Sequence, residues 1–249
     1  MKNPHDSTVA PFDRDAVSNA GYLYTTGARV SSQMANQRLT DAAMEAVSFR
    51  GKRVLDLGCG DGTYTMDLFD RGQPAYICGV DPAQKAIEVA RQKAAGRTIE
   101  FAVESAYQLP FEKDHFDIAH LRGVLHHMDR PEVAVREALR VASTVVIIEP
   151  NGYNPVLKLL ERLSSYHREH EEKSYPSHKL KLWIEEAGGE VRSQQWAGLV
   201  PFFCPDPMAR LLKVVEPLCE RLPLFRLLSC AVCVLVAVRR EVGVERGRA

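Results

Sequence analysis

The apolar positions of this chain follow two periods, one typical of strands and one typical of helices. Short apolar runs predict seven strands, near residues 53–57, 76–81, 98–104, 115–121, 144–149, 190–197 and 231–238. Apolar residues three and four positions apart predict helices between the early strands, near 63–71, 83–95 and 131–141. Strands that alternate with helices indicate an α/β fold, a doubly wound and mostly parallel sheet with helices on both faces.

The pattern changes on both sides of this alternating region. A helix is predicted near 31–49, before the first strand. After Asn151, helices are predicted from Asn154 onward and at 177–187. Apolar residues then recur at helical spacing from Met208 to Leu222, and Pro217 is expected to bend that segment. The later part of the chain is therefore expected to add helices to the sheet.

The first predicted strand ends in glycines at alternate positions, Gly58, Gly60 and Gly62. Glycine lets the backbone turn sharply and lets a ligand lie against bare main chain. Asp81 ends the second predicted strand, where an acid of a doubly wound sheet can hold ribose hydroxyls. These residues predict a nucleoside site, although many α/β folds use glycine here for packing alone.

The spacing and charge of the glycine loop indicate which nucleoside it binds. A dinucleotide loop reads G-x-G-x-x-G, and here Thr63 stands at the third glycine position. Asp56 and Asp61 flank the loop and would repel a pyrophosphate, whereas they would attract a cation. This favours S-adenosylmethionine, which carries an ammonium and a sulfonium, over NAD.

Five segments, in order, resemble the class I S-adenosylmethionine-dependent methyltransferases, in particular their quinone-biosynthesis-like branch. They are VLDLGCGDGTYT (54–65), GVDPAQKAIEVAR (79–91), LPFEKDHFDIAH (109–120), GVLHHMDRPEVAVREALRV (123–141) and VVIIEPNG (145–152). The resemblance implies a Rossmann-like methyltransferase fold of seven strands, the last inserted antiparallel. It also implies one domain over 1–249, with an N-terminal lid and helix (1–50), a cofactor-binding core (51–152), an acceptor cap with the sixth strand (153–229) and the last strand (230–240).

The same resemblance implies a set of cofactor-binding residues at the strand ends. They are Asp56, Gly58, Cys59, Gly60, Asp81, Pro82, Ser105, Ala106, Arg122 and Tyr24. Asp81 is expected to hold both ribose hydroxyls and Pro82 to pack on the adenine, although Asp81 is also a favoured helix cap. Ser105 departs from the aspartate that family members often carry there, so its contact with the adenine amino group would lack a charge.

The acceptor side of the site is expected at the ends of the fourth and fifth strands. His126 or His127 could act as a base because imidazole titrates near neutral pH, or one could pack while the other faces solvent. A metal pair is not expected, because adjacent residues do not converge on one ion. Tyr22, Glu149, Asn151 and Tyr153 are the predicted acceptor contacts, with aromatic packing as the alternative for Tyr22.

Composition narrows the class of protein further. The 249 residues carry 32 basic and 32 acidic side chains, so charge gives no reason to expect nucleic acid or an anionic membrane as partner, and no apolar run is long enough to span a membrane. Six scattered cysteines lie in apolar runs, which favours reduced thiols and a cytoplasmic location. Cys230 and Cys233 form a C-x-x-C, but on a strand their side chains would point to opposite faces.

The sequence thus predicts an S-adenosylmethionine-dependent methyltransferase, monomeric or homodimeric, that acts on a small and partly hydrophobic metabolite by in-line transfer. Residues 153–178 and 201–229 are expected to cover the acceptor, or to bury their apolar side chains in a dimer interface. Two alternatives remain open, a catalytically silent nucleoside-binding protein of the same fold and an NAD-dependent dehydrogenase.

Overall fold

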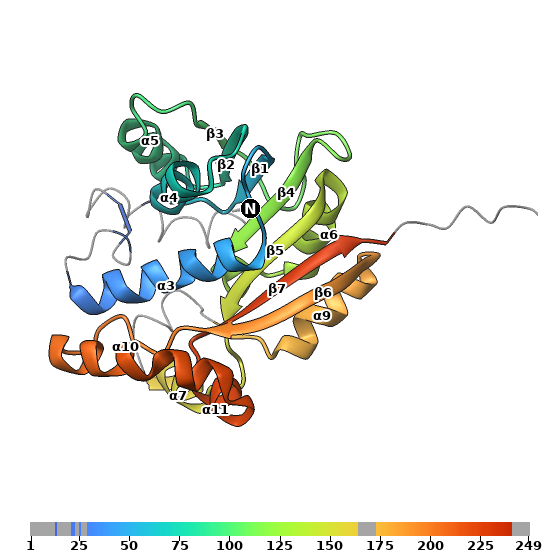
Figure 1. Cartoon of the computed structure of the whole chain (residues 1–249). Coiled ribbons are helices and arrows are strands. Elements are labelled where there is room, and N and C mark those ends of the chain that lie inside the picture. Colours follow the sequence, from blue (N-terminus) through green and yellow to red (C-terminus); the bar gives the residue numbers. More distant parts are fainter. Residues whose placement is uncertain (1–12, 14–20, 23–24, 26–28, 164–172, 241–249) are drawn as a thin grey trace, which may run out of the picture.

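A sheet of seven strands runs through the centre of the computed structural model, which describes residues 13, 21–22, 25, 29–163 and 173–240 (Figure 1). The strands are β1 (Arg53–Leu57), β2 (Tyr76–Asp81), β3 (Glu100–Val103), β4 (Phe116–Arg122), β5 (Ala142–Pro150), β6 (Gly189–Ala197) and β7 (Val232–Arg239). Their order is β3-β2-β1-β4-β5-β7-β6, and only β7 pairs antiparallel with its neighbours. The predicted fold class and the antiparallel last strand are confirmed.

Helices cover both faces of this sheet and one of its ends (Figure 1). The helices of the alternating region and its flanks are α3 (Val30–Ala46), α4 (Thr63–Gly72), α5 (Gln84–Lys93), α6 (Pro131–Val141) and α9 (Ser177–Glu186). A short 3-10 turn, η1 (Leu125–His127), follows β4. The remaining helices are α7 (Pro155–Leu163), α10 (Asp206–Arg221) and α11 (Pro223–Ser229).

Side-chain alternation along the strands divides the core into two main layers. Val54 and Ile118 face one way and pack with Leu39 of α3, whereas Leu55 and Leu121 face the other way and pack with residues of α6 and α9. Successive side chains of a strand point to opposite faces, so a strand buried on both faces reads as a continuous apolar run. This is why short apolar runs located the strands correctly.

Pro217, where a bend is predicted, lies inside α10. The helix continues through Pro217 to Arg221 and ends before Leu222, whose backbone is extended (φ −80°, ψ 120°). Pro223 then begins α11, at a position where a missing N–H leaves no helical hydrogen bond unmade. Within the described part of the chain, none of the helices combines the length and the apolar character that crossing a membrane requires.

Candidate active site

The glycine loop lies at the carboxyl end of β1 and is tied to β2 by its backbone. The N–H groups of Gly58 and Cys59 donate to the carbonyl oxygen of Val80 at 2.7 and 3.0 Å. Gly58, Gly60 and Gly62 have φ values of 75°, 54° and 74°, a region that favours glycine. The alternate glycines therefore make a tight loop beside the end of β2, as the sequence predicts.

Asp81 closes this loop from the end of β2. Its carboxylate accepts the N–H of Gly60 at 3.0 Å and the N–H of Ala83 at 2.8 Å, so it joins the loop to the residue that precedes α5. No lysine or arginine of the described residues pairs with it. Burial raises the pKa of Asp81 to about 6, because it outweighs the two backbone donors and is reinforced by the charges of Asp13 and Asp56. The carboxylate retains lone pairs for further donors such as ribose hydroxyls.

Asp61 forms hydrogen bonds with three residues around the glycine loop. Its carboxylate accepts the backbone N–H of Tyr22 at 3.1 Å, the hydroxyl of Thr25 at 2.5 Å and the ammonium of Lys93 at 2.7 Å. Burial opposes its ionisation, but the hydrogen bonds from Lys93 and Thr25 hold the pKa of Asp61 below its ordinary value. Because Lys93 neutralises it, Asp61 is not the unpaired negative charge that the sequence argument assumes.

Tyr22 lies directly over the glycine loop. An added Cβ on Gly60 would come within 2.3 Å of Cε2 of the Tyr22 ring. The ring also packs on Ala83 and Ala86, and burial, together with the charges of Asp81 and Asp61, raises the pKa of its phenol. The structure thus places Tyr22 beside the predicted ribose contact, whereas Tyr24 lies outside the described residues.

Asp56 points into the protein from the middle of β1. Its carboxylate accepts the hydroxyl of Thr65 at 2.5 Å and lies 2.8 Å from Nδ1 of His120, and both acid and imidazole are buried. Among the described residues, Nε2 of His120 has no hydrogen-bond partner. Asp56 therefore has internal partners that sequence reasoning missed, and its contact with a cofactor stays a prediction.

Arg122 joins the end of β4 to α3. Its guanidinium lies over the Tyr64 ring, 3.5 Å from the centroid, and donates to Oγ1 of Thr40 at 2.9 Å and to the carbonyl of Asn36 at 3.1 Å. Burial lowers the pKa of Arg122. Its side chain thus serves packing between elements, and only its backbone is left for the predicted cofactor contact.

Glu149 anchors the loop that carries the two histidines. The buried carboxylate accepts the N–H groups of Val124 and Leu125, each at 2.8 Å, and lies 2.8 Å from Nδ1 of His126. The ring centroids of His126 and His127 are 3.9 Å apart. Glu149 therefore orients the His126 imidazole, which is a role that the sequence does not reveal. The predicted base and acceptor roles of these residues stay predictions.

The other predicted acceptor residues face different elements. Asn151 is fully buried and donates from Nδ2 to the carbonyls of Leu227 and Cys230 at 2.8 and 3.0 Å. The hydroxyl of Tyr153 lies 2.7 Å from Nδ1 of His178, at the start of α9. Asn151 thus holds α11 against the end of β5, and Tyr153 contacts α9. Neither residue has a hydrogen bond to the glycine loop.

The predicted adenine contacts lie just after β3. The Ser105 hydroxyl accepts the N–H of Tyr107 at 3.3 Å, while Ala106 is buried in the main core. The backbone N–H of Glu104 donates to the carbonyl of Asp81 at 3.2 Å, which brings this turn to the Asp81 end of β2. Ser105 and Asp81 are thus in adjacent turns, as an adenosine site requires, and Pro82 is half-buried beside them.

Comparison with known proteins agrees with this arrangement. Residues 55–145 match the family described as "Methyltransferase domain". The demethylmenaquinone methyltransferase of Lactococcus lactis is 32% identical over 119 residues, 45% of this chain and 46% of that protein. The ubiquinone biosynthesis O-methyltransferase of Pseudomonas entomophila is 29% identical over 167 residues, 59% of this chain and 68% of that protein. The chain spans about half or less of the length of several curated relatives that it matches.

Solved structures share the fold over nearly the whole chain. An S-adenosylmethionine-dependent methyltransferase of Thermotoga maritima, described as a possible histamine N-methyltransferase, aligns with a TM-score of 0.66 and 16% identity over 94% of this chain and 100% of its own. Magnesium protoporphyrin IX methyltransferase of Synechocystis, solved with S-adenosylhomocysteine, aligns with a TM-score of 0.65 and 16% identity. The alignment covers 95% of this chain and 97% of that chain. At such low identity these structures show the fold alone.

Proposed function

We propose that the chain is a class I S-adenosylmethionine-dependent methyltransferase, similar to the branch of the quinone-biosynthesis enzymes, and that it methylates a small, partly hydrophobic metabolite. S-adenosylmethionine is the cofactor. The family match covers the cofactor-binding core, whereas the acceptor is inferred from the cap and from the relatives, two of which are named for quinone biosynthesis.

One observation carries this proposal, the pairing of the glycine loop with an acid that has no cation. Gly60 donates its N–H to Asp81, and no described basic side chain neutralises that carboxylate. An acid in this position accepts ribose hydroxyls. Dinucleotide sites also carry an acid at this position, so the preference for an adenosyl donor over a dinucleotide is supported instead by Thr63, which stands where a diphosphate loop has its third glycine, and by the match of residues 55–145 to a methyltransferase family.

The residues of this chain contribute mainly alignment. When bound, S-adenosylmethionine supplies an already activated methyl group, so the protein needs to hold the acceptor in line and exclude water. Tyr22 and the Asp61 hydrogen bonds close one side of the cofactor loop. His126, whose Nδ1 lies 2.8 Å from the Glu149 carboxylate, would take a proton if the acceptor is a neutral hydroxyl.

We assign the acceptor cap to residues 153–229 and the reaction to a reducing compartment such as the cytoplasm. The cap helices lie at the end of the sheet where β1, β4 and β5 finish (Figure 1). All six cysteines are free thiols, including Cys230 and Cys233, as expected for reduced cysteines.

Labelled-methyl transfer tests the proposal. The full chain, incubated with methyl-labelled S-adenosylmethionine and a panel of phenols, quinols and lipid-like metabolites, is expected to label at least one apolar acceptor. Binding of the cofactor without labelling of any acceptor would favour the silent binding protein instead. Binding of NAD in preference to S-adenosylmethionine would favour a dehydrogenase.

A further inference from the structure

The three cap helices carry their apolar side chains on the outside. On α10, Leu211, Val214 and Leu218 recur at helical spacing and are 60 to 78% exposed. Most other large apolar side chains that are exposed in the described residues lie elsewhere on α10, on α7, on α11 or at Leu222, the exceptions being Val103, Leu182 and Phe203. We call this the leucine surface, represented by Leu159, Leu163, Leu211, Val214, Leu218 and Leu224.

The three helices that carry the leucine surface are neighbours in the fold. Helix α10 packs against α11, and α11 packs against α7, so that the three form one layer at the end of the sheet (Figure 1). Soluble monomers rarely expose apolar patches larger than a few hundred Å², and larger patches mark docking sites.

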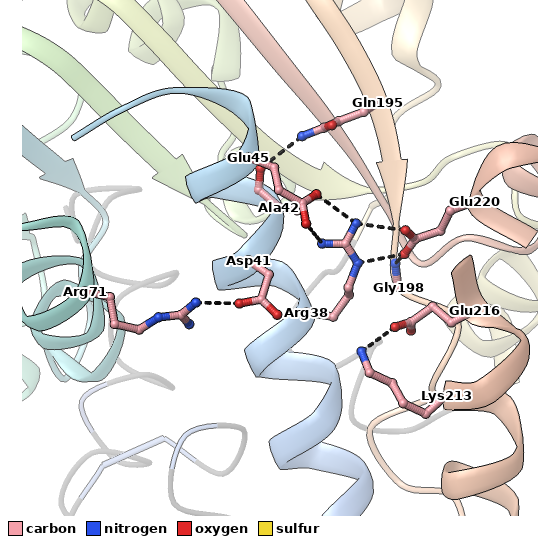
Figure 2. Close-up of polar contacts among 10 residues, drawn as sticks. All are labelled: Arg38, Asp41, Ala42, Glu45, Arg71, Gln195, Gly198, Lys213, Glu216 and Glu220. Atoms are coloured by element: carbon pink, nitrogen blue, oxygen red, sulfur yellow. Dashed lines mark hydrogen bonds and ion pairs between the residues drawn. The ribbon is translucent and has the colours of Figure 1, made fainter. Parts of the chain in front are cut away.

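The charged side chains of α10 are arranged in the opposite way to those of an ordinary surface helix. Glu216 is buried, accepts the N–H of Leu199 at 2.9 Å and pairs with Lys213. Glu220 accepts the N–H of Gly198 at 2.9 Å and pairs with Arg38 of α3 at 2.8 Å. Figure 2 shows both acids engaged on the side of α10 that faces Gly198 and α3. The acids of α10 beyond its first turn are thus directed inward.

Arginines take the outer positions. Arg210 and Arg221 of α10 are exposed beside the leucine surface, whereas Asp206 is the one exposed acid of that helix. The exposed charges of α10 are therefore mainly positive. Leucines bordered by arginines on a helix that lies flat are typical of helices that bind in the headgroup region of a bilayer.

We propose that the leucine surface docks on a lipid bilayer that contains anionic headgroups. The leucines would enter the boundary of the acyl chains and the arginines would meet the lipid phosphates, with no helix crossing the membrane. A second copy of the chain is disfavoured because a two-fold contact would bring the arginines of both copies together with few exposed acids to pair them. If the proposed function holds, a lipid-like acceptor would enter the site from this bilayer; the docking itself does not depend on methyl transfer.

Sedimentation with phosphatidylcholine vesicles, with and without phosphatidylglycerol, tests the proposal on the full chain in the absence of cofactor. We expect binding to the vesicles that contain phosphatidylglycerol. Replacing one arginine, as in Arg210→Gln or Arg221→Gln, should weaken this binding about fivefold. The double variant Leu211→Ser, Leu218→Ser should weaken it at least about tenfold.

Matched controls separate docking from general damage. Leu182→Ser on α9 removes a leucine that is 50% exposed outside the leucine surface, and Arg136→Gln on α6 removes an exposed arginine elsewhere. Both should bind vesicles like the parent chain, and all variants should keep the parent affinity for S-adenosylmethionine. Absence of vesicle binding by the parent, or equal binding by the leucine pair and Leu182→Ser, overturns the proposal. A dimer without vesicle binding, dissociated by the leucine pair in light scattering, assigns the surface to a second copy instead.

Discussion

Three carboxylates near the glycine loop have three different sets of partners. Asp56 is satisfied by Thr65 and His120, Asp61 is neutralised by Lys93, and Asp81 accepts only backbone N–H groups. Three aspartates of one site therefore differ in whether they bind a side chain, a cation or only the backbone. Of the three, Asp81 alone keeps a charge with no cationic partner among the described residues.

Cofactor affinity should depend on pH through Asp81. Burial raises its pKa to about 6, so the carboxylate that we propose as the acceptor for ribose hydroxyls becomes protonated as the pH falls below this value. Affinity for S-adenosylmethionine should therefore be constant above about pH 7 and decrease by up to about tenfold per pH unit below about pH 6. Isothermal titration with S-adenosylmethionine at several pH values between about 5 and 8 measures this affinity.

The matched variant is Asp81→Asn, which keeps the shape of the side chain but cannot ionise. It should bind the cofactor more weakly at neutral pH, by about the 1–3 kcal/mol of a lost charged hydrogen bond, with little further loss on acidification. A parent chain whose affinity does not change between pH 5 and pH 8 would contradict the ribose assignment.

Gly60→Ala should disturb the loop far more than an equivalent change elsewhere. Its φ of 54° already disfavours alanine by about 1–2 kcal/mol, and the new Cβ would press on the Tyr22 ring. We expect at least about tenfold weaker binding of S-adenosylmethionine. Gly96→Ala is the control, because Gly96 also has a positive φ, 87°, but has open space around it. The Gly96→Ala variant should therefore bind S-adenosylmethionine with the affinity of the parent chain.

Helix α3 connects the cofactor loop side of the molecule with the cap. Arg38 pairs with Glu220 of α10, and Arg71 of α4 pairs with Asp41 on another side of α3 (Figure 2). Burial alone would lower the pKa of Arg38, but hydrogen bonds and charges from Glu220 and Glu45 raise it. The first pair is thus largely shielded from water, whereas the second is about one-third exposed.

This difference predicts unequal costs for removing the two arginines. Arg38→Met leaves Glu220 without its charged donor and should lower the free energy of unfolding by about 2–3 kcal/mol. Arg71→Met should lower it by less than about 1 kcal/mol, because exposed ion pairs contribute little. Denaturant unfolding of both variants gives the comparison, and equal losses would show that the Arg38 pair is no more than a surface contact.

The sheet and its helices form one framework in which the cofactor loop and the cap share the carboxyl ends of the strands. A ligand that binds this framework and not the unfolded chain stabilises the whole of it. At one hundred times its dissociation constant, S-adenosylmethionine should add about 2.7 kcal/mol to the stability. For a chain of this size that corresponds to a rise of about 5–10 °C in Tm.

A thermal scan with S-adenosylmethionine, S-adenosylhomocysteine and NAD measures this effect. The first two ligands should raise Tm, and NAD at the same concentration should leave it unchanged because Thr63 replaces the third glycine of a diphosphate-binding loop. Stabilisation by NAD alone would favour the hypothesis of an NAD-dependent dehydrogenase over that of a methyltransferase.

The sequence by itself determined the sheet, its helices and the glycine loop with Asp81. These features depend on local periodicity and on turn residues close together in the chain, and buried parallel strands show as uninterrupted apolar runs. Val54 to Leu57, followed by three alternate glycines, predicts a strand and a tight turn without any knowledge of the rest of the fold.

Only the tertiary structure decided how the charged residues are paired and which way the cap helices face. Lys93 reaches Asp61 across 32 residues and Glu220 reaches Arg38 across 182, distances at which no local pattern specifies a partner. Likewise, the helical spacing of Leu211, Val214 and Leu218 predicts an apolar face but not its direction. The direction follows from Glu216 and Glu220, whose bonds to the Leu199 and Gly198 backbone turn the polar face of α10 inward and its leucines outward.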